Sequence, residues 1–245
     1  MSFEQLDAAC ERWDELVSEG DGAATQVAEL RERLVSRGVV ADGRPLCNVL
    51  RPHLLTPELL ERQTTSAGHV ESAAAKVRDA LLSDEDLGRA HLGGLREWVG
   101  DLLELEANPA GVGALLRLDA SLARTRLHYI EINADMPQGV GHHDAILDAF
   151  MELEAMQRFA AETPVRPLRL EPPMRETLLA VWSEWGGQGE PAIGVLTRTE
   201  DAVRVSSLEI DIEAYRRNGL DAAIHDPSEL SFDGGRLRAI HRLYE

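Results

Sequence analysis

Leu116-Arg117-Leu118-Asp119 and Tyr129-Ile130-Glu131-Ile132-Asn133 are the two stretches of the sequence that decide the fold. Apolar and polar residues alternate in both, which is the period of a β-strand. The seven residues 120–126 between them are enough to return the chain antiparallel. We therefore predict a hairpin with a polar face formed by Arg117, Asp119, Glu131 and Asn133. The opposite face, formed by Leu116, Leu118, Ile130 and Ile132, is expected to pack on the core.

The polar face of this hairpin favours a divalent cation. Two carboxylates, Asp119 and Glu131, lie with the amide of Asn133 on one side, and Mg²⁺ prefers oxygen ligands of this kind. Arg117 beside them can neutralise a carboxylate or contact a phosphate. A second interpretation needs no ligand: Arg117 forms a salt bridge with Asp119 or Glu131, and such charge pairs are common on hairpins.

The pattern R-x-D followed by E-x-N-A-D-x-P resembles the glutathionylspermidine synthase-like proteins, which are circularly permuted ATP-grasp enzymes. The resemblance implies that Asp119, Glu131 and Asn133 bind Mg²⁺ and that Arg117 and Asp119 contact ATP. It also implies a catalytic role for Arg117 at the phosphate. The following loop, Asp135-Met136-Pro137-Gln138-Gly139, would help to form the substrate side of the site.

Weaker similarities extend over most of the chain. Arg51-Pro52-His53, the segment near Ile193 and Asp226-Pro227-Ser228-Glu229-Leu230 are all similar to bacterial members of this family whose substrates are unknown. The resemblance implies an ATP-dependent ligase that joins a small-molecule carboxylate to an amine through an acyl phosphate, with ATP and Mg²⁺ as cofactors.

The family holds ATP with lysines that lie further along the chain, whereas Lys76 is the only lysine here. We therefore expect this chain to be inactive alone: it is either a fragment of a longer ligase or a degenerate member of the family, and a separate chain could supply the remaining ATP-grasp half. The alternative is a non-catalytic binding or assembly module on a truncated ligase-like scaffold. A metal-dependent hydrolase is disfavoured because no arrangement of nucleophile and base is recognisable.

The helices and strands expected from the sequence predict a mixed α and β fold (α+β or α/β) in three segments. Residues 1–110 are expected to be mainly helical, and residues 111–163 to hold the site hairpin and a following helix. Residues 164–245 would form a small α/β unit that resembles a pre-ATP-grasp domain and is truncated at its end. In this unit, strands near 191–196 and 222–224 flank a helix that starts at a capping box at Ser206, so the strands are expected to be parallel.

Local signals predict several helix boundaries. Gly20-Asp21-Gly22 should break a helical stretch over 3–37, and Gly38 should end it. Thr56-Pro57-Glu58 is a strong helix start. Asp84 and Gly93 are expected to begin two further helices, and residues 143–162 to form another.

Composition narrows the class of partner. The formal net charge is −18, which disfavours nucleic acid and membrane surfaces as partners. The N-terminus lacks the features of a signal peptide, and no apolar run reaches the ~20 residues of a membrane span. Cys10 and Cys47 do not suggest a disulfide framework, so the sequence predicts a cytoplasmic protein.

His142-His143-Asp144 is a second set of residues with ligand chemistry. Histidine and aspartate both bind metals, but adjacent histidines rarely point at one ion. Capping of a helix or exposure at the surface is the favoured interpretation.

Overall fold

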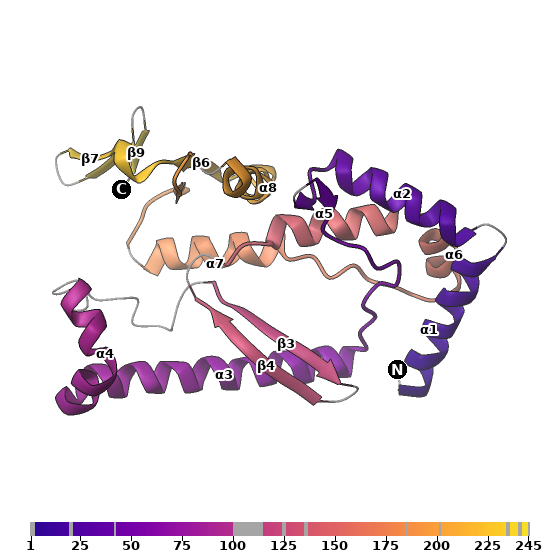
Figure 1. Ribbon diagram of the computed structural model, residues 1–245, viewed down its shortest axis with the longest axis horizontal. Coiled ribbons are helices and arrows are strands. Elements are labelled where there is room, and N and C mark those ends of the chain that lie inside the picture. Colours follow the sequence, from indigo (N-terminus) through magenta and orange to yellow (C-terminus); the bar gives the residue numbers. More distant parts are fainter. Residues whose placement is uncertain are drawn as a thin grey trace. The chain divides into compact units, whose positions relative to one another are not determined.

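The computed structural model describes residues 3–19, 22–41, 43–99, 115–123, 126–134, 137–184, 186–200, 202–233, 236–239 and 242–244 (Figure 1). Its α-helices are α1 (Phe3–Ser18), α2 (Gly22–Ser36), α3 (Pro57–Ser83), α4 (Glu85–Val99), α5 (Val140–Met151), α6 (Glu154–Glu162), α7 (Glu171–Glu184) and α8 (Ala202–Arg217). Its strands are β1 (Val40–Ala41), β2 (Arg44–Pro45), β3 (Arg117–Ala123), β4 (Arg126–Asn133), β5 (Ala192–Leu196), β6 (Asp221–His225), β7 (Leu230–Asp233), β8 (Arg236–Ala239) and β9 (Arg242–Tyr244), with a short 3₁₀ turn η2 (Pro227–Glu229). The mixed helix and strand composition is as expected.

Helices whose ends are set by local chemistry begin and end where the sequence predicts. Thr56 caps α3: its Oγ1 accepts a hydrogen bond from the backbone N–H of Leu59 at 3.1 Å, and Pro57 follows in the first turn. Gly38 follows α2 with φ of 72°, and the N–H of Val39 reaches back to the carbonyl of Leu34. This left-handed glycine satisfies the last carbonyls of the helix.

Three helix predictions are wrong in their boundaries. Helix α4 runs without a break through Gly93-Gly94, so no new helix begins there. The predicted helix over 143–162 is two helices, α5 and α6, separated at Leu153. Helix α8 begins at Ala202, so Ser206 lies inside it and is not a cap.

Four small sheets are present in the described part of the chain. The pairs β1–β2 and β3–β4 are antiparallel, whereas β5 and β6 are parallel across the crossover helix α8, as predicted. β7 pairs antiparallel with β8, and β9 pairs antiparallel with the other edge of β8.

The chain folds into two compact units. Residues 55–137 form the first unit, which holds α3, α4 and the β3–β4 hairpin. Residues 2–54 and 138–245 form the second. Within the second unit, α1 and α2 pack on α5 and α6, which are distant in sequence.

The second unit contains the main hydrophobic core. Trp13 of α1 is 1% exposed and meets Phe159 of α6 edge to face, with ring centroids 5.8 Å apart. The other fully or largely buried members of this core are Ala9, Leu16, Val17, Leu30, Leu34, Val39, Ala149, Phe150, Leu153, Ala155 and Met156. Arg12 also joins α1 to α6 through two hydrogen bonds to Glu162.

The first unit buries few hydrophobic side chains among its described residues. Leu59 is the only hydrophobic residue in the described part of this unit that is classed as buried. The expectation that Ile130 and Ile132 face a core is wrong, because Ile130 is 73% and Ile132 41% exposed. In the described residues the hairpin is a two-stranded sheet with no third strand beside it, so it has too little neighbouring structure to bury both faces.

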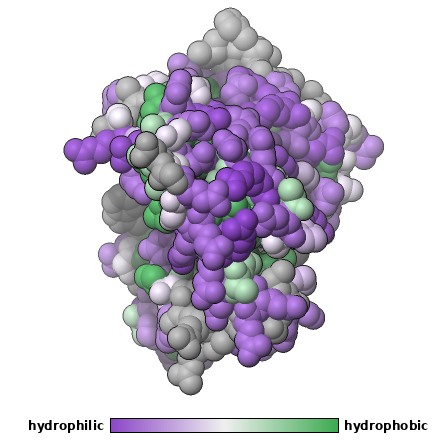
Figure 2. All heavy atoms as spheres, turned by 90° about the vertical axis from the view of Figure 1, so that its right-hand side faces the viewer, coloured by the Kyte–Doolittle hydropathy of each residue, from purple (hydrophilic) through white to green (hydrophobic). Residues whose placement is uncertain are grey.

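One face of the molecule is mainly hydrophilic. The face in Figure 2, on the side of α1, α2 and α6, is covered mainly by hydrophilic residues, with hydrophobic residues scattered singly. Among the described residues, no helix combines the length and the apolar character needed to cross a membrane. Cys10 and Cys47 are free thiols.

Candidate functional site

The β3–β4 hairpin brings the four predicted site residues onto one face. Arg117 lies opposite Asn133, and Asp119 lies opposite Glu131. Because alternate residues of a strand share a face and opposite residues of a pair stand side by side, the four side chains form one cluster. The antiparallel pairing predicted from the sequence is therefore confirmed.

A β-bulge lies directly beside this cluster. Glu131 pairs with Asp119 and Tyr129 pairs with Ala120, so Ile130 is an extra residue of β4 without a partner. A bulge bends the strand and increases its twist, and bulges of this kind often direct side chains at functional sites. It also explains why Ile130 points to solvent. Simple alternation in the sequence does not reveal the extra residue.

Arg117 and Asp119 form an ion pair along β3. The Nε of Arg117 donates to Oδ1 of Asp119 at 2.8 Å, and its Nη2 lies 3.4 Å from Oδ2. This hydrogen bond lowers the pKa of the Asp119 carboxyl and raises the pKa of Arg117. Of the two salt bridges considered from the sequence, the structure therefore contains the one with Asp119.

Glu131 and Asn133 are joined along β4. The Nδ2 of Asn133 donates to Oε1 of Glu131 at 3.0 Å, and also lies 3.5 Å from the carbonyl of Arg117. Both contacts are made by the amide nitrogen, so neither of them uses the amide oxygen, Oδ1. With the carboxylates of Asp119 and Glu131 it makes a set of oxygen donors that fits Mg²⁺ in chemistry. No cluster of three or more His, Cys, Asp or Glu residues with metal-binding geometry occurs in the described ranges.

The predicted substrate loop is described only in part, since Asp135 and Met136 lie outside the described residues. Pro137 and Gln138 precede α5 without regular structure. Gly139 occupies the N-cap position of α5 with φ of 116°, a left-handed conformation that favours glycine. Its N–H donates to Oδ2 of Asp211 at 3.2 Å, and the N–H of Gly141 donates to Oδ1 at 2.8 Å.

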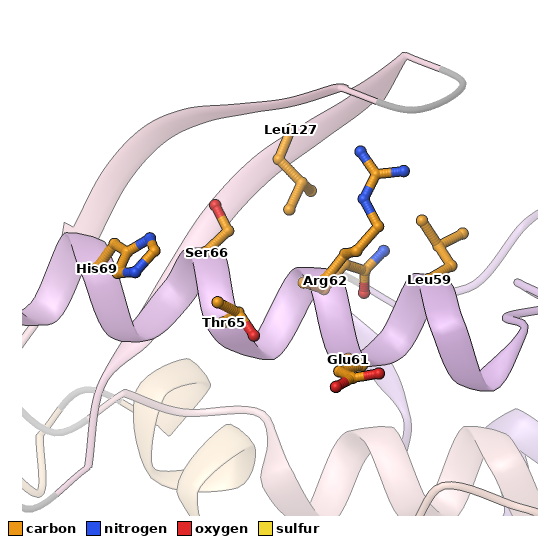
Figure 3. Close-up of a pocket in the computed structure, with 8 residues that line it drawn as sticks. Leu59, Glu61, Arg62, Thr65, Ser66, His69 and Leu127 are labelled. Carbon is orange, nitrogen blue, oxygen red and sulfur yellow. The ribbon is translucent and has the colours of Figure 1, made fainter.

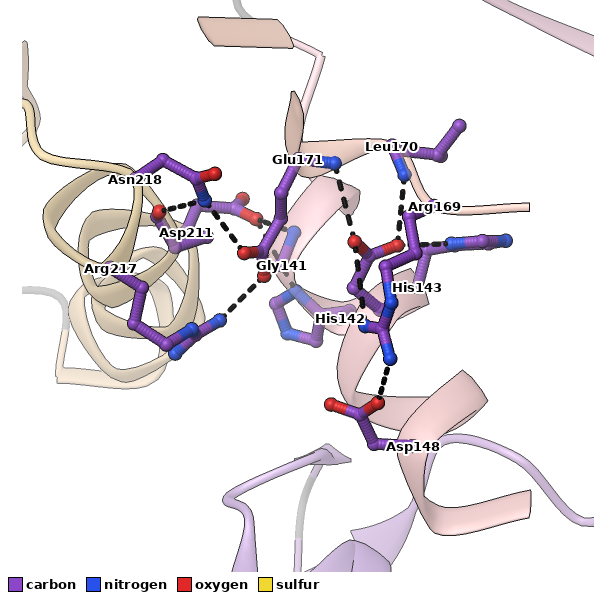
Figure 4. Close-up of polar contacts among 12 residues, drawn as sticks. Gly141, His142, His143, Asp148, Arg169, Leu170, Glu171, Asp211, Arg217 and Asn218 are labelled. Atoms are coloured by element: carbon purple, nitrogen blue, oxygen red, sulfur yellow. Dashed lines mark hydrogen bonds and ion pairs between the residues drawn. The ribbon is translucent and has the colours of Figure 1, made fainter. Parts of the chain in front are cut away.

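The adjacent residues His142 and His143 point to different environments (Figure 4). His142 is buried, and its Nδ1 lies 3.9 Å from Oδ1 of Asp211, beyond hydrogen-bonding distance. The side chain of His143 is 41% exposed, and its Nδ1 contacts the buried Oδ1 of Asp144 at 2.8 Å. Asp144 in turn accepts from the N–H groups of Leu170 and Glu171, at the start of α7. The capping interpretation holds for Asp144, although the helix it caps is α7.

A buried polar network, not anticipated from the sequence, joins α7 to α8 (Figure 4). Glu171 is 9% exposed and accepts hydrogen bonds from Arg217 Nη2 at 2.6 Å and from Asn218 Nδ2 at 2.8 Å. The Glu171 carboxylate is therefore paired and satisfied, which is the usual condition for a buried charge. The network stabilises the packing of these helices. No local pattern in the sequence pairs residue 171 with residue 217.

Asp226 holds the carboxyl ends of β5 and β6 together. Its carboxylate accepts from the backbone N–H and the hydroxyl of Ser228, and from both groups of Thr199. These hydrogen bonds lower the pKa of Asp226 well below its usual range. The Asp226-Pro227-Ser228 segment, which carries part of the family resemblance, has a structural role at this position.

Comparison of the sequence with protein-family models and with curated proteins found no match in either case.

Proposed function

We propose that this chain contributes the Mg²⁺- and ATP-contacting hairpin of an ATP-dependent carboxylate–amine ligase of the circularly permuted ATP-grasp type. The single observation that carries the proposal is the strand register, which pairs Arg117 with Asn133 and Asp119 with Glu131 on one face. The R-x-D and E-x-N resemblance supports the same assignment. A separate chain would supply the remaining half of the nucleotide site.

The residues of the hairpin would have different roles. Asp119, Glu131 and Asn133 would hold Mg²⁺, which when bound offsets the charge of the nucleotide phosphates. Arg117 is held by Asp119, to which its Nε donates a hydrogen bond. Once a cation shares the carboxylate, the guanidinium would turn to a phosphate oxygen, which it can bind through two N–H groups.

Asp119 would also be ready to bind a cation at neutral pH. The pKa of this carboxyl is lowered by Arg117, so it stays ionised. Arg117 at the same time reduces the repulsion between Asp119 and Glu131, which lie directly opposite one another. The hairpin can therefore hold two carboxylates together before a cation arrives.

Titration with Mn²⁺, followed by water-proton relaxation, tests the metal assignment. Glu131→Gln should weaken the binding of Mn²⁺ relative to the wild type. Glu85→Gln is the matched control, because the Glu85 side chain is 82% exposed on α4, outside the hairpin. Equal relaxation in the wild type and in Glu131→Gln would remove the metal site from the proposal.

The ligase activity itself is tested by the release of ADP from ATP in the presence of pooled amino acids, peptides and polyamines. The Asp119→Asn variant provides the blank. We expect no turnover above this blank for the chain alone, and turnover when the chain that supplies the missing half is added. Turnover by the isolated chain would show that its own residues complete the nucleotide site.

The second candidate is a non-catalytic assembly module, and the exposed side chains of Ile130 and Ile132 favour it. A β4 strand with two exposed isoleucines beside an open edge is a surface on which a second copy of the chain can pair. Sedimentation of the wild type over a range of concentrations, compared with an Ile130→Thr, Ile132→Thr double variant, tests this. A monomer at every concentration in both proteins argues against assembly through this face.

A further inference from the structure

We propose that His143 and Asp144, at the start of α5, form a reactive pair in which Nε2 of His143 accepts an acyl group from an uncharged activated ester. Nδ1 of His143 lies 2.8 Å from Oδ1 of Asp144. The His143 side chain is 41% exposed, whereas that of Asp144 is 2% exposed. A buried carboxylate that holds one nitrogen of an exposed imidazole makes the other nitrogen more basic and more nucleophilic.

The carboxylate of Asp144 is fixed in place by the start of α7. It accepts a hydrogen bond from the backbone N–H of Leu170 at 3.0 Å and one from that of Glu171 at 3.3 Å. Arg169 pairs with Asp148, and its Nη1 lies 4.0 Å from Oδ2 of Asp144, beyond hydrogen-bonding distance. The carboxylate therefore cannot turn away from His143 without leaving two backbone N–H groups of α7 unsatisfied.

These contacts determine which nitrogen of His143 can react. The Asp144 carboxylate accepts hydrogen bonds, so Nδ1 of the neutral ring carries the proton and donates to it. Nε2, on the other side of the ring, then holds the lone pair, and it has no hydrogen-bond partner in the described part of the chain. The adjacent His142 is buried beside Asp211 and points elsewhere (Figure 4). The nucleophile is thus Nε2 of His143.

The step is a nucleophilic acyl transfer. Nε2 forms a bond to the carbonyl carbon of the ester, and the bond from that carbon to the leaving oxygen breaks, so the oxygen departs as an anion with the bonding pair. The positive charge that develops on the ring lies beside Asp144, which offsets it. Water then adds to the acyl carbon and the bond to Nε2 breaks, which restores the lone pair. In sum, ester and water give acid and alcohol, and His143 is unchanged.

The charges near the pair favour an uncharged acyl donor. Arg169, the arginine beside Asp144, is already paired with Asp148. The chain also carries a formal net charge of −18, which opposes the approach of an anionic donor such as an acyl phosphate. The inference does not depend on the proposed ligase activity, because it requires neither ATP nor a metal.

Diethyl pyrocarbonate, an uncharged reagent that transfers an ethoxycarbonyl group to neutral imidazoles, measures the reactivity of each histidine in the full chain. His53 and His69 are internal controls, because both are more exposed than His143 and neither ring has a partner among the described residues. Figure 3 shows the ring of His69 on α3, apart from the carboxylate of Glu61. Tandem mass spectrometry of timed samples should show that His143 is modified faster than either control, although it is less exposed.

Two substitutions complete the test. Asp144→Asn keeps an acceptor oxygen for α7 but offers the ring an N–H₂ donor, so the ring proton should move to Nε2. The rate at His143 should then fall about tenfold or more, while the rates at His53 and His69 stay unchanged. His143→Gln should remove most of the hydrolysis of p-nitrophenyl acetate by the chain, and His53→Gln should not.

The His143→Gln variant leaves Asp144 and its contacts with α7 in place, so the ester assay decides the question even if Asp144→Asn does not fold. Circular dichroism would verify the fold of each variant. The proposal fails if His143 reacts no faster than the two controls, if a folded Asp144→Asn variant keeps the wild-type rate at His143, or if His143→Gln hydrolyses the ester as the wild type does.

Discussion

Gly141 allows α5 and α8 to approach so closely that a methyl group would not fit between them. A Cβ added at this position would lie 2.6 Å from the carbonyl oxygen of Ile210 and 3.1 Å from the Cβ of Ala214. The first of these is a backbone atom of a neighbouring helix and cannot turn aside. The same close approach brings the N–H of Gly141 within reach of Asp211.

Gly141→Ala is therefore expected to destabilise the protein by about 2 kcal/mol or more, since it forces the two helices apart. Gly68→Ala is the matched control, because Gly68 lies inside α3 with no atom within 4 Å of its added Cβ. That substitution should stabilise its helix by about 0.5–1 kcal/mol. Thermal melts followed by circular dichroism would compare the stabilities of the Gly141→Ala and Gly68→Ala variants. Equal effects of the two alanines would mean that the close contact at Gly141 is absent in solution.

Asp226 should make the stability depend on pH in the acidic range. Its pKa is lowered by hydrogen bonds from Ser228 and Thr199, so the folded state favours the carboxylate more than the unfolded state does. The stabilisation is then complete above the ordinary value of 3.8 and is lost as the pH falls below it. Asp226→Ala should lower the melting temperature at neutral pH, and this deficit should shrink below about pH 3.8. A deficit that stays constant with pH would contradict the role of ionisation.

Residues with a local role could be read from the sequence, and residues with a distant partner could not. Thr56, Pro57 and Gly38 act within their own helix turns, and each was predicted at its position. Asp211 and Gly141 act on each other across 70 residues of sequence. No pattern of spacing connects such a pair before the fold is known.

At the scale of elements, three helices of the second unit begin on side chains that other helices provide. Asp211 of α8 accepts from the first turn of α5, Gln26 of α2 from Ala155 in α6, and Asp144 of α5 from Glu171 in α7. All three acceptors are buried. Because the first N–H groups of a helix have no partner inside it, each of these contacts fixes both the start of a helix and its packing.

Asp144→Ala should consequently lower the free energy of unfolding more than the removal of one exposed carboxylate does. It leaves the N–H groups of Leu170 and Glu171 without their acceptor in a buried place, which should destabilise the second unit by about 2–3 kcal/mol. Asp148→Ala is the control on the same helix. The Asp148 side chain is 44% exposed and pairs with Arg169, so its loss should cost less than about 1 kcal/mol. Urea unfolding followed by circular dichroism would compare the free energies of unfolding of the two variants. Equal losses would refute the capping role.

The pairing of the two strands of the candidate site could be predicted from the sequence, but the β-bulge between them could not. The alternation in Arg117–Asp119 and Glu131–Asn133 was sufficient to predict an antiparallel hairpin with the polar residues together. The bulge at Ile130 was not predictable, because an extra residue in one strand depends on how the partner strand is placed. The continuation of helix α4 through Gly93-Gly94 was also not predicted. Each glycine weakens a helix by only about 1 kcal/mol, and the surrounding residues outweigh this.

At the scale of the whole molecule, buried apolar surface is distributed unevenly between the two units. The second unit has a core built from α1, α2, α5 and α6, which come from the two stretches of sequence on either side of the first unit. In the first unit, large apolar residues of α3, α4 and β4 remain exposed, among them Val77, Leu82, Leu95 and Ile130.

This difference in buried apolar surface predicts that local unfolding costs less free energy in the first unit than in the second. Local stability follows buried apolar contact, and Leu59 is the only buried hydrophobic residue that the described part of the first unit contributes. The β3–β4 hairpin is a two-stranded sheet, and such sheets are marginal in water. The amide hydrogens of β4 should thus exchange at least about tenfold faster than those of α5, after correction for intrinsic rates, which corresponds to about 1.4 kcal/mol. Hydrogen exchange measured by NMR on the full chain makes the comparison. Equal protection in both elements would show that the hairpin unfolds only together with the core of the second unit.

Mn²⁺ added to the same sample should slow exchange in β4 more than in α5 if Asp119 and Glu131 hold it, because a cation that binds only the folded hairpin stabilises it.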